Sequence, residues 1–367
     1  MVMLIFIVLV ALVRNCRMLS NDSPSVHEDS SIPTVHVAFL VFGSVTNIHN
    51  VEHVVRSILN ARNKQWSLVY HVVTYREVMM WGSEKSYPSS ANATRKIYLL
   101  EHLSRKNKNL YNQFKLICGR VAGQNYMIKP LLHYILAKIS RVIVLDIDLF
   151  VAVDLLHIWL QFDKMDELGV CVGLVEEQQP NYYFKGAVGY NGGVQLLNLA
   201  AMRSGYSGYS QAISYIISKR KAEPNFFINI FGMSLGDQDF YSWLRVYNSS
   251  LCMSLPCHWN IQLCDHFFKA LYNHKKHSLV TLTSLKKVII NASVSFQVGC
   301  DTATISILHG NGAKSAGRAM IRDFFLSNLT GSAFIQANSL SIKKLRVNHE
   351  LSPLEHVEKA ITMRINK

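Results

Sequence analysis

The fold is decided by the stretch Arg141-Val142-Ile143-Val144-Leu145-Asp146-Ile147-Asp148. An apolar run rich in Val and Ile that ends in polar residues is typical of an interior strand in a parallel sheet. Ligands of open α/β sheets bind beyond the carboxyl ends of such strands, and alternate strand residues share a face. We therefore expect Asp146 and Asp148 to reach one sheet edge and to form an oxygen-rich site for Mn²⁺ or Mg²⁺. The alternative is a solvated turn with a helix cap.

The flanking segments predict an α/β fold with a Rossmann-like, mostly parallel sheet. Apolar runs predict strands at residues 35–42, 67–74, 96–99 and 170–175. Helical spacing of apolar residues predicts helices at residues 50–59 and 124–139, the second with Pro130 near its start. Because strands and helices alternate along the chain, the strands are expected to run parallel.

The composition limits the possible functions. The chain has 367 residues, of which 49% are hydrophobic and 17% charged, enough for one large α/β domain or two small ones. The net charge is +14, but the Lys and Arg residues are scattered, so we expect no nucleic-acid partner and favour a basic cleft for a nucleotide-sugar or an acidic glycan. The motifs of dehydrogenases, P-loop kinases, serine hydrolases and zincins are absent from the sequence. These absences favour a nucleotide held mainly through a metal.

Four downstream segments add polar groups that fit this interpretation. Residues 189–194 place Asn191 in a Gly-rich turn before a strand, where a ligand can approach the backbone. Residues 235–239 precede a helical run, so Asp237 is either a site residue or an N-cap. Residues 255–262 form a polar-aromatic turn, in which Trp259 is expected to pack rather than bind sugar. Residues 305–314 predict a strand ending in His309, followed by Gly and Lys.

In this order, the D-x-D strand, the N-x-G-V strand, the D-Q-D helix start and the His-x-x-Gly loop with Lys resemble glycosyltransferase family 8, over roughly residues 35–325. Residues 141–148, 173–176 and 259–266 resemble the xylosyltransferase domain of LARGE-type enzymes, whereas residues 307–311 are closer to the glucoside xylosyltransferases. The resemblance implies a GT-A fold with a smaller acceptor-side subdomain. One inserted segment, residues 275–298, has no counterpart in the pattern.

The resemblance also implies roles for individual residues. It assigns Mn²⁺ to three ligands: Asp146, Asp148 and His309. It assigns donor binding to a larger set, in which the first three residues line the uridine pocket: Val37, Ala38, Phe39, Lys129, Asp146, Gly192, Gly312 and Lys314. It places three residues at the reacting sugar: Asn191, Asp237 and Gln238.

The implied reaction is the Mn²⁺-dependent transfer of xylose from UDP-xylose to a glycan or glycoprotein acceptor, with retention of configuration. Because the uncharged amide of Gln238 is a poor nucleophile, we favour front-face attack, with the departing phosphate accepting the acceptor's proton. Two alternatives stay open. The donor could be UDP-glucose or UDP-galactose, which pocket size would decide, or the chain could be an inactive UDP-binding relative.

The start of the chain predicts a membrane location. Thirteen apolar residues, 1–13, span about 20 Å as a helix, which suits a signal peptide or a short signal anchor. Residues 14–34 are mostly polar and predict a flexible stem, followed by a catalytic domain at 35–330 and a basic segment at 331–367. We expect a single-pass type II protein of the Golgi or ER membrane. A disulfide among Cys252, Cys257, Cys264 and Cys300 would fit such an oxidising compartment.

Overall fold

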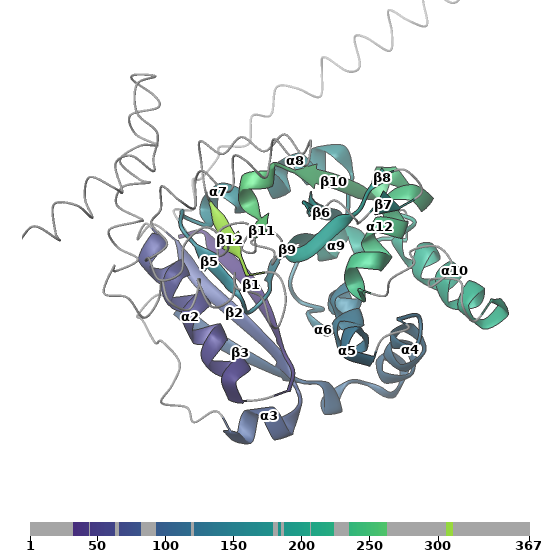
Figure 1. Cartoon of the computed structure of the whole chain (residues 1–367), viewed down its shortest axis with the longest axis horizontal. Helices are drawn as coiled ribbons and strands as arrows, with labels where there is room; N and C mark the ends of the chain where they lie inside the picture. The colour runs from purple at the N-terminus through teal and green to yellow at the C-terminus, as the bar shows by residue number, and fades with distance from the viewer. Residues whose placement is uncertain are drawn as a thin grey trace, which may run out of the picture. The chain divides into compact units, whose positions relative to one another are not determined.

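A seven-stranded sheet forms the centre of the computed structural model (Figure 1), with the strand order β10-β6-β9-β4-β1-β2-β3. Its strands are β1 (Thr34–Val41), β2 (Ser67–Thr74), β3 (Ala93–Leu99), β4 (Arg141–Leu145), β6 (Val172–Glu176), β9 (Tyr190–Asn198) and β10 (Cys252–Leu255). Neighbouring strands pair in parallel, except that β9 runs antiparallel to both β4 and β6. The predicted mostly parallel α/β sheet is confirmed.

The structure describes residues 32–43, 45–62, 66–81, 93–118, 121–178, 183–184, 187–205, 207–223, 235–262 and 306–310. From Thr34 onward these residues belong to one compact unit. Several predictions fall outside them: the N-terminal segment 1–13, nearly all of the stem, the insertion 275–298, the C-terminal segment 331–367, and both Gly312 and Lys314. Within the described part of the chain, no helix combines the length and apolar character that crossing a bilayer requires.

Helices cover both faces of the sheet. One face packs against α2 (Val45–Ala61), α7 (Leu156–Trp159) and α8 (Gln161–Leu168). The other packs against α4 (Arg105–Lys115), α6 (Leu132–Ile135), α9 (Leu199–Arg203), α10 (Tyr209–Ala222) and α12 (Asp237–Tyr247). In Figure 1, α2 lies to the left of the sheet and α4, α6 and α10 to the right. Short helices α3 (Arg76–Trp81) and α5 (Val121–Gln124) complete the set that the description covers.

The strand sequences explain the two hydrophobic layers. In β1, Val35, Val37 and Phe39 contact the α2 layer, whereas Ala38 and Leu40 contact the opposite layer. Each of these side chains is at most 4% exposed. A strand buried on both faces needs a continuous apolar run rather than alternation, and each large apolar side chain contributes about 1.5–3 kcal/mol when fully buried. The sheet thus gives its carboxyl edge a rigid support.

A small second sheet brings the end of the described chain to this edge. It has the order β11-β12-β5 and consists of β11 (Ile261–Gln262), β12 (Ile307–His309) and β5 (Leu149–Val151). The antiparallel pairing of β12 with β5 sets His309 opposite Leu149, directly after the D-x-D motif. A two-stranded ribbon, β7 (Tyr183–Phe184) and β8 (Ala187–Val188), lies before β9 in the chain.

The predicted helix at residues 124–139 is wrong in its form. The segment folds as a 3₁₀ helix, η3 (Asn125–Leu131), followed by the single turn of α6. Pro130 lies inside η3 and provides no backbone N–H, and a residue before proline is disfavoured in the α conformation. Lys129, the residue before Pro130, is almost completely buried. Three further 3₁₀ turns are η2 (Leu100–His102), η4 (Ser249–Leu251) and η5 (Cys257–Trp259).

Candidate metal and donor site

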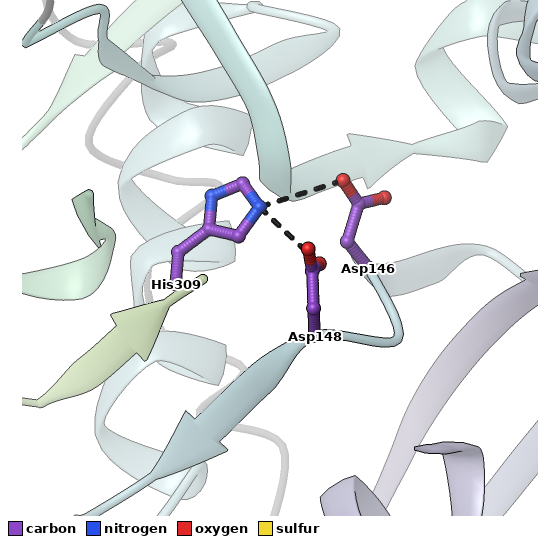
Figure 2. A group of neighbouring side chains, drawn as sticks. All are labelled: Asp146, Asp148 and His309. Atoms are coloured by element: carbon purple, nitrogen blue, oxygen red, sulfur yellow. Dashed lines mark ion pairs between the residues drawn. The ribbon is translucent and has the colours of Figure 1, made fainter. Parts of the chain in front are cut away.

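The structure brings the three predicted metal ligands together (Figure 2). The Nε2 atom of His309 lies 3.4 Å from Oδ1 of Asp148 and 3.8 Å from Oδ2 of Asp146. One ligand atom from each residue falls within a group no more than 4.8 Å across. Two atoms that bind one small divalent ion at about 2.1 Å lie at most about 4.2 Å apart, so both distances from the imidazole suit a shared ion. We call these three residues the metal-binding group.

Backbone contacts hold the metal-binding group in place. Asp146 follows β4, and its N–H donates to the carbonyl oxygen of Gly193 at 2.9 Å. The N–H of Gly310 donates to the carbonyl oxygen of Asp148 at 2.8 Å, next to the β12–β5 pairing. The imidazole therefore reaches the carboxylates because strand pairing aligns its backbone with theirs, although about 160 residues separate them in sequence.

A β-bulge shapes the wall of this site. The register between β6 and β9 shifts between Leu174 and Val175, so that residues 192–194 bulge from the pairing with β6. A Cβ atom on Gly193 would lie 2.3 Å from Cε1 of His309, and one on Gly192 would lie 2.8 Å from Oδ2 of Asp237. Only glycine allows both approaches. The Gly-rich stretch, predicted to be a turn before a strand, thus lies inside β9.

The donor atoms suit a hard divalent cation. Asp148 and His309 are 7% and 3% exposed, and Nδ1 of His309 is buried without a hydrogen-bond partner among the described residues. Burial lowers the pKa of His309, but Asp148 and Asp146, together with Glu177, raise it by more, and the pKa lies above its ordinary value. An excess of negative charge thus surrounds the imidazole. An imidazole nitrogen with two carboxylate oxygens is a donor set that fits a divalent metal.

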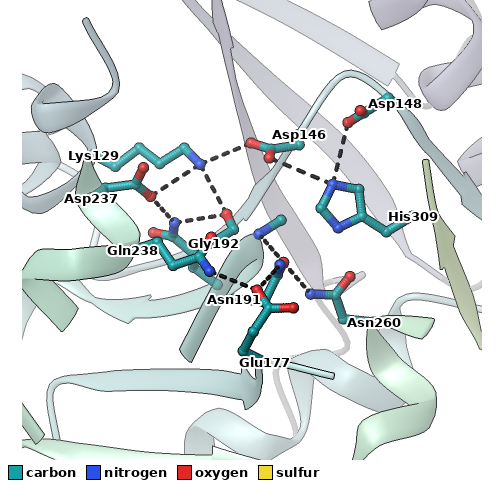
Figure 3. A network of polar contacts seen from close by, with 12 residues as sticks. Lys129, Asp146, Asp148, Glu177, Asn191, Gly192, Asp237, Gln238, Asn260 and His309 are labelled. Atoms are coloured by element: carbon teal, nitrogen blue, oxygen red, sulfur yellow. Dashed lines mark hydrogen bonds and ion pairs between the residues drawn. The ribbon is translucent and has the colours of Figure 1, made fainter. Parts of the chain in front are cut away.

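A second polar group centres on Lys129 (Figure 3). Its ammonium donates to Oδ1 of Asp146 at 2.8 Å and to the carbonyl oxygen of Gly192 at 2.9 Å, and lies 3.1 Å from Oδ2 of Asp237. The Nε2 atom of Gln195 donates to the same Asp237 oxygen at 2.7 Å. We call Lys129, Asp146, Asp237 and Gln195 the lysine-centred group. Three acceptors match the three ammonium hydrogens, so the lysine is saturated.

Burial and shared charge act on this group in opposite directions. Burial lowers the pKa of Lys129, but Asp146 and Asp237 raise it by more, so the lysine stays charged. Burial raises the pKa of Asp237, Lys129 opposes this change, and Asp146 reinforces it. The net effect raises the pKa of Asp237 to about 6, because burial outweighs the attraction of an ammonium that Asp237 shares with Asp146. Asp237 is not the N-cap, which is Gly236, but the first residue of α12.

The other predicted site residues lie at varying depth. Val37, Ala38 and Phe39 are fully buried in the sheet interior, and their predicted contact with uridine stays a prediction. Asn191 is 1% exposed, and Gln238 is half-buried at the start of α12. Trp259 packs in the hydrophobic core. The carboxylate of Asp239, in the first turn of α12, accepts a hydrogen bond from the N–H of Leu235, which precedes the helix. We find Gly312 and Lys314 outside the described residues.

Sequence reasoning missed several residues of the site. Glu177 is 2% exposed and accepts hydrogen bonds from Asn191 and Gln238, and Gln195 and Asn260 belong to the same network. Glu177 comes two residues after the predicted strand at residues 170–175 and directly after β6, at the sheet edge that also carries the D-x-D motif. Its place after a strand was therefore a usable signal. Gln195 shows no such signal, because it is a single polar residue in an apolar run. Asn260 lies in the polar-aromatic turn at residues 255–262, but nothing in that turn singles it out.

Comparison of the sequence with known proteins finds xylosyltransferases. The chain is 35% identical over 140 residues to the xylosyl- and glucuronyltransferase LARGE2s of Gallus gallus, which covers 35% of this chain and 18% of that protein. It is 29% identical over 176 residues to xyloside xylosyltransferase 1 of Mus musculus, which covers 40% of this chain and 42% of that protein. The match thus spans less than half of either relative. No protein-family model matches the chain.

Comparison of the fold finds glycosyltransferases. The crystal structure of mouse xyloside xylosyltransferase 1 in its apo form superposes with a TM-score of 0.57 at 20% identity, covering 76% of this chain and 98% of that one. The galactosyltransferase LgtC, in complex with donor and acceptor sugar analogues, superposes with a TM-score of 0.50 at 13% identity, covering 80% and 96%. These matches confirm the predicted GT-A fold. The predicted resemblance to the xylosyltransferases of glycosyltransferase family 8 is likewise confirmed.

Proposed function

We propose that the chain is a retaining, Mn²⁺-dependent xylosyltransferase that uses UDP-xylose and a glycan or glycoprotein acceptor. The observation that carries this proposal is the convergence of Asp146, Asp148 and His309 at the carboxyl end of β4. The similarity to enzymes named xylosyltransferases supports the sugar, and the GT-A fold supports the nucleotide-sugar chemistry. When bound, a divalent cation supplies positive charge that neutralises the diphosphate of the departing UDP.

The nucleobase is expected to bind next to the metal-binding group. β1 pairs with β4 such that Phe39 lies opposite Leu145. The last two residues of β1, Leu40 and Val41, and Phe42 directly after the strand therefore come level with the D-x-D motif. Phe42 contacts the rings of Tyr75 and Tyr126, both with centroids 5.7 Å away. These three rings, at the same edge as Lys129, form a suitable surface for a flat uracil ring.

In the reaction we propose, the acceptor hydroxyl attacks the anomeric carbon from the side on which UDP departs. The new bond joins the hydroxyl oxygen to the anomeric carbon, and the bond from that carbon to the β-phosphate oxygen breaks with its electron pair on the oxygen. The hydroxyl proton moves to the same phosphate oxygen, so atoms and charges balance. Asp237 and Gln238 stabilise the positive charge that develops on the sugar.

We also propose a lumenal location in the Golgi or ER as a type II membrane protein, with residues 1–13 as the anchor. The apolar character of that segment supports this proposal. Cys257 is disulfide-bonded, whereas Cys252 is a free thiol, and a disulfide fits an oxidising compartment. Imaging of the tagged chain in cells with and without residues 1–13 tests the location. Loss of Golgi or ER staining is expected without the segment, and unchanged staining contradicts its role.

The activity is tested by UDP release from UDP-xylose, UDP-glucose and UDP-galactose with Mn²⁺, repeated with EDTA. UDP-xylose is expected to react fastest, and EDTA is expected to stop the release. Asp148→Asn is expected to lose activity, whereas Asp163→Asn, a change of an exposed carboxylate paired with Arg141, serves as the matched control. An equal rate with UDP-glucose would overturn the donor, and UDP binding without any release would identify an inactive UDP-binding protein.

A further inference from the structure

A chain of side-chain amides leads from the wall of the metal-binding group to the start of α12 (Figure 3). The Nδ2 atom of Asn260 donates to Oδ1 of Asn191 at 2.8 Å. The Nδ2 atom of Asn191 donates to Oε2 of Glu177 at 2.9 Å, and the Nε2 atom of Gln238 donates to the same oxygen at 2.6 Å. One carboxylate oxygen therefore receives two amide donors, from a β-strand and from a helix.

Two groups in this series of hydrogen bonds cannot exchange the roles of donor and acceptor. The backbone N–H of Gly193 can only donate, and it donates to Oδ1 of Asn191 at 2.9 Å. An ionised carboxylate can only accept, so Glu177 requires an NH₂ group from each neighbour. Asn191 is thus oriented from both ends. The orientation of Gln238 depends on Glu177, because a terminal amide can otherwise turn over at little cost.

The geometry points to a positioning role for Glu177: by binding the NH₂ group of Gln238, it leaves the carbonyl oxygen Oε1 of that amide as the free end, available to the reacting sugar. This inference rests on the proposed function. Oε1 of Gln238 accepts no hydrogen bond from any residue that the structure describes. Positive charge develops on the sugar ring as UDP departs, and a carbonyl dipole turned toward it stabilises that charge. A reversed amide would present its NH₂ group and have the opposite effect.

The backbone around Glu177 is built to hold this carboxylate inward. Glu177 follows β6, its N–H donates to the carbonyl oxygen of Gly189 at 2.7 Å, and its side chain is 2% exposed. The preceding residue, Glu176, turns the other way and pairs with Arg245 at 2.8 Å near the surface. Two adjacent carboxylates therefore serve different purposes, and Glu176 provides a matched control.

The test compares Glu177→Met, Glu177→Gln and Glu176→Gln in the UDP-release assay with UDP-xylose and Mn²⁺. Methionine keeps the length of the side chain but accepts no strong hydrogen bond, so kcat is expected to fall about 100-fold while KM changes less than about threefold. Glutamine keeps an acceptor oxygen but can also present its own NH₂ group, so a fall of about 10-fold is expected. Glu176→Gln is expected to match the wild type.

The readouts separate positioning from a structural role. The rise in Tm that Mn²⁺ causes should stay the same in all three variants, because none of them changes a metal ligand. An unchanged kcat in Glu177→Met, or a fall in kcat with an equal loss of the Mn²⁺ effect on Tm, would overturn the inference. If Glu177→Met does not fold, Glu177→Gln decides, and wild-type kcat in that variant overturns the inference. A wild-type protein that releases no UDP would overturn the proposed function itself.

Discussion

The metal-binding group and the lysine-centred group share Asp146 but differ in how fully the nitrogen atoms of their basic side chains are paired. Oδ1 of Asp146 accepts a hydrogen bond from Lys129 at 2.8 Å, and Oδ2 lies 3.8 Å from the imidazole of His309. The lysine has an acceptor for each of its hydrogens, whereas Nδ1 of His309 is buried without a partner in the part of the chain that the structure describes. Burial of charge is common to both groups. In the lysine-centred group the buried atom without a partner among the described residues is the neutral amide oxygen Oε1 of Gln195, so what distinguishes the two groups is the pairing of the basic side chain.

The largest effect on the free energy of unfolding is expected from removing the positive charge of the lysine-centred group. Lys129→Met would leave Asp146 and Asp237 without their shared ammonium, and breaking a buried ion pair costs about 3–5 kcal/mol. The free energy of unfolding, measured with urea, should fall by that amount. Lys219→Met removes an exposed lysine that pairs with Glu223, and no measurable change is expected there. Equal losses in the two variants would contradict the comparison.

The next prediction concerns the metal-binding group and Gly193, which packs against it. In Gly193→Ala the new Cβ would lie 2.3 Å from Cε1 of His309, so the imidazole must move away from the carboxylates. Mn²⁺ at 100 times its Kd should stabilise the wild type by about 2.7 kcal/mol, and most of this gain should be lost in the variant. Calorimetry with and without the ion measures the difference. Gly205→Ala, where a Cβ meets nothing within 4 Å, should keep the full gain.

A third prediction concerns how stability depends on pH. The segment formed by η3 and α6 carries Lys129 and also a buried histidine, His133, whose charge changes with pH. Burial lowers the pKa of His133 to about 4 from 6.5, Arg203 adds to this effect, and the carbonyl of Pro130 opposes it. A histidine whose pKa is depressed in the folded state stabilises the fold above pH 6.5 and loses that contribution as the pH falls toward 4.

The expected slope is at most about 1.4 kcal/mol per pH unit between pH 6.5 and 4. Denaturant unfolding in EDTA at several pH values measures it for the wild type and for His133→Gln, in which the slope should become shallower. A variant with the wild-type slope would show that other groups cause the loss of stability in acid.

The smallest effect is expected at the surface. Arg141 pairs with Asp163 and Asp166, and the side chain of Asp163 is 61% exposed. Exposed ion pairs typically contribute less than about 1 kcal/mol, so Asp163→Ala should change the free energy of unfolding by no more than that. High salt should reduce even this change. A loss comparable to that of Lys129→Met would mean that pairing, rather than burial, determines the cost.

The strands of the sheet could be predicted from the sequence more accurately than the segments that carry the site residues. The apolar runs of β1, β2 and β4 mark buried parallel strands, and the predicted second strand has the same ends as β2. The helix over residues 124–139 was wrong because helical spacing of apolar residues does not reveal the effect of Pro130 and the buried Lys129 on the backbone. The metal-binding group was predictable from the D-x-D motif and its resemblance to known enzymes.

The network around Glu177 was not predictable in the same way. Its contacts depend on the bulge in β9 and on the position of the first turn of α12. Neither feature produces a periodic pattern of residues that could be recognised in the sequence. Asn191 illustrates the limit. Its place near the sugar was implied by resemblance, but its hydrogen bonds to Glu177, Gly193 and Asn260 depend on three separate segments that only the folded chain brings together.

The pairing of β12 with β5 has a consequence for synthesis on the ribosome. The seven strands of the main sheet are all encoded by residue 255, whereas the imidazole arrives at residue 309. A nascent chain can therefore assemble both carboxylates long before their third companion emerges from the exit tunnel. A site that needs all three ligands can form only after residue 309 has been synthesised, 54 residues after the last strand of the main sheet.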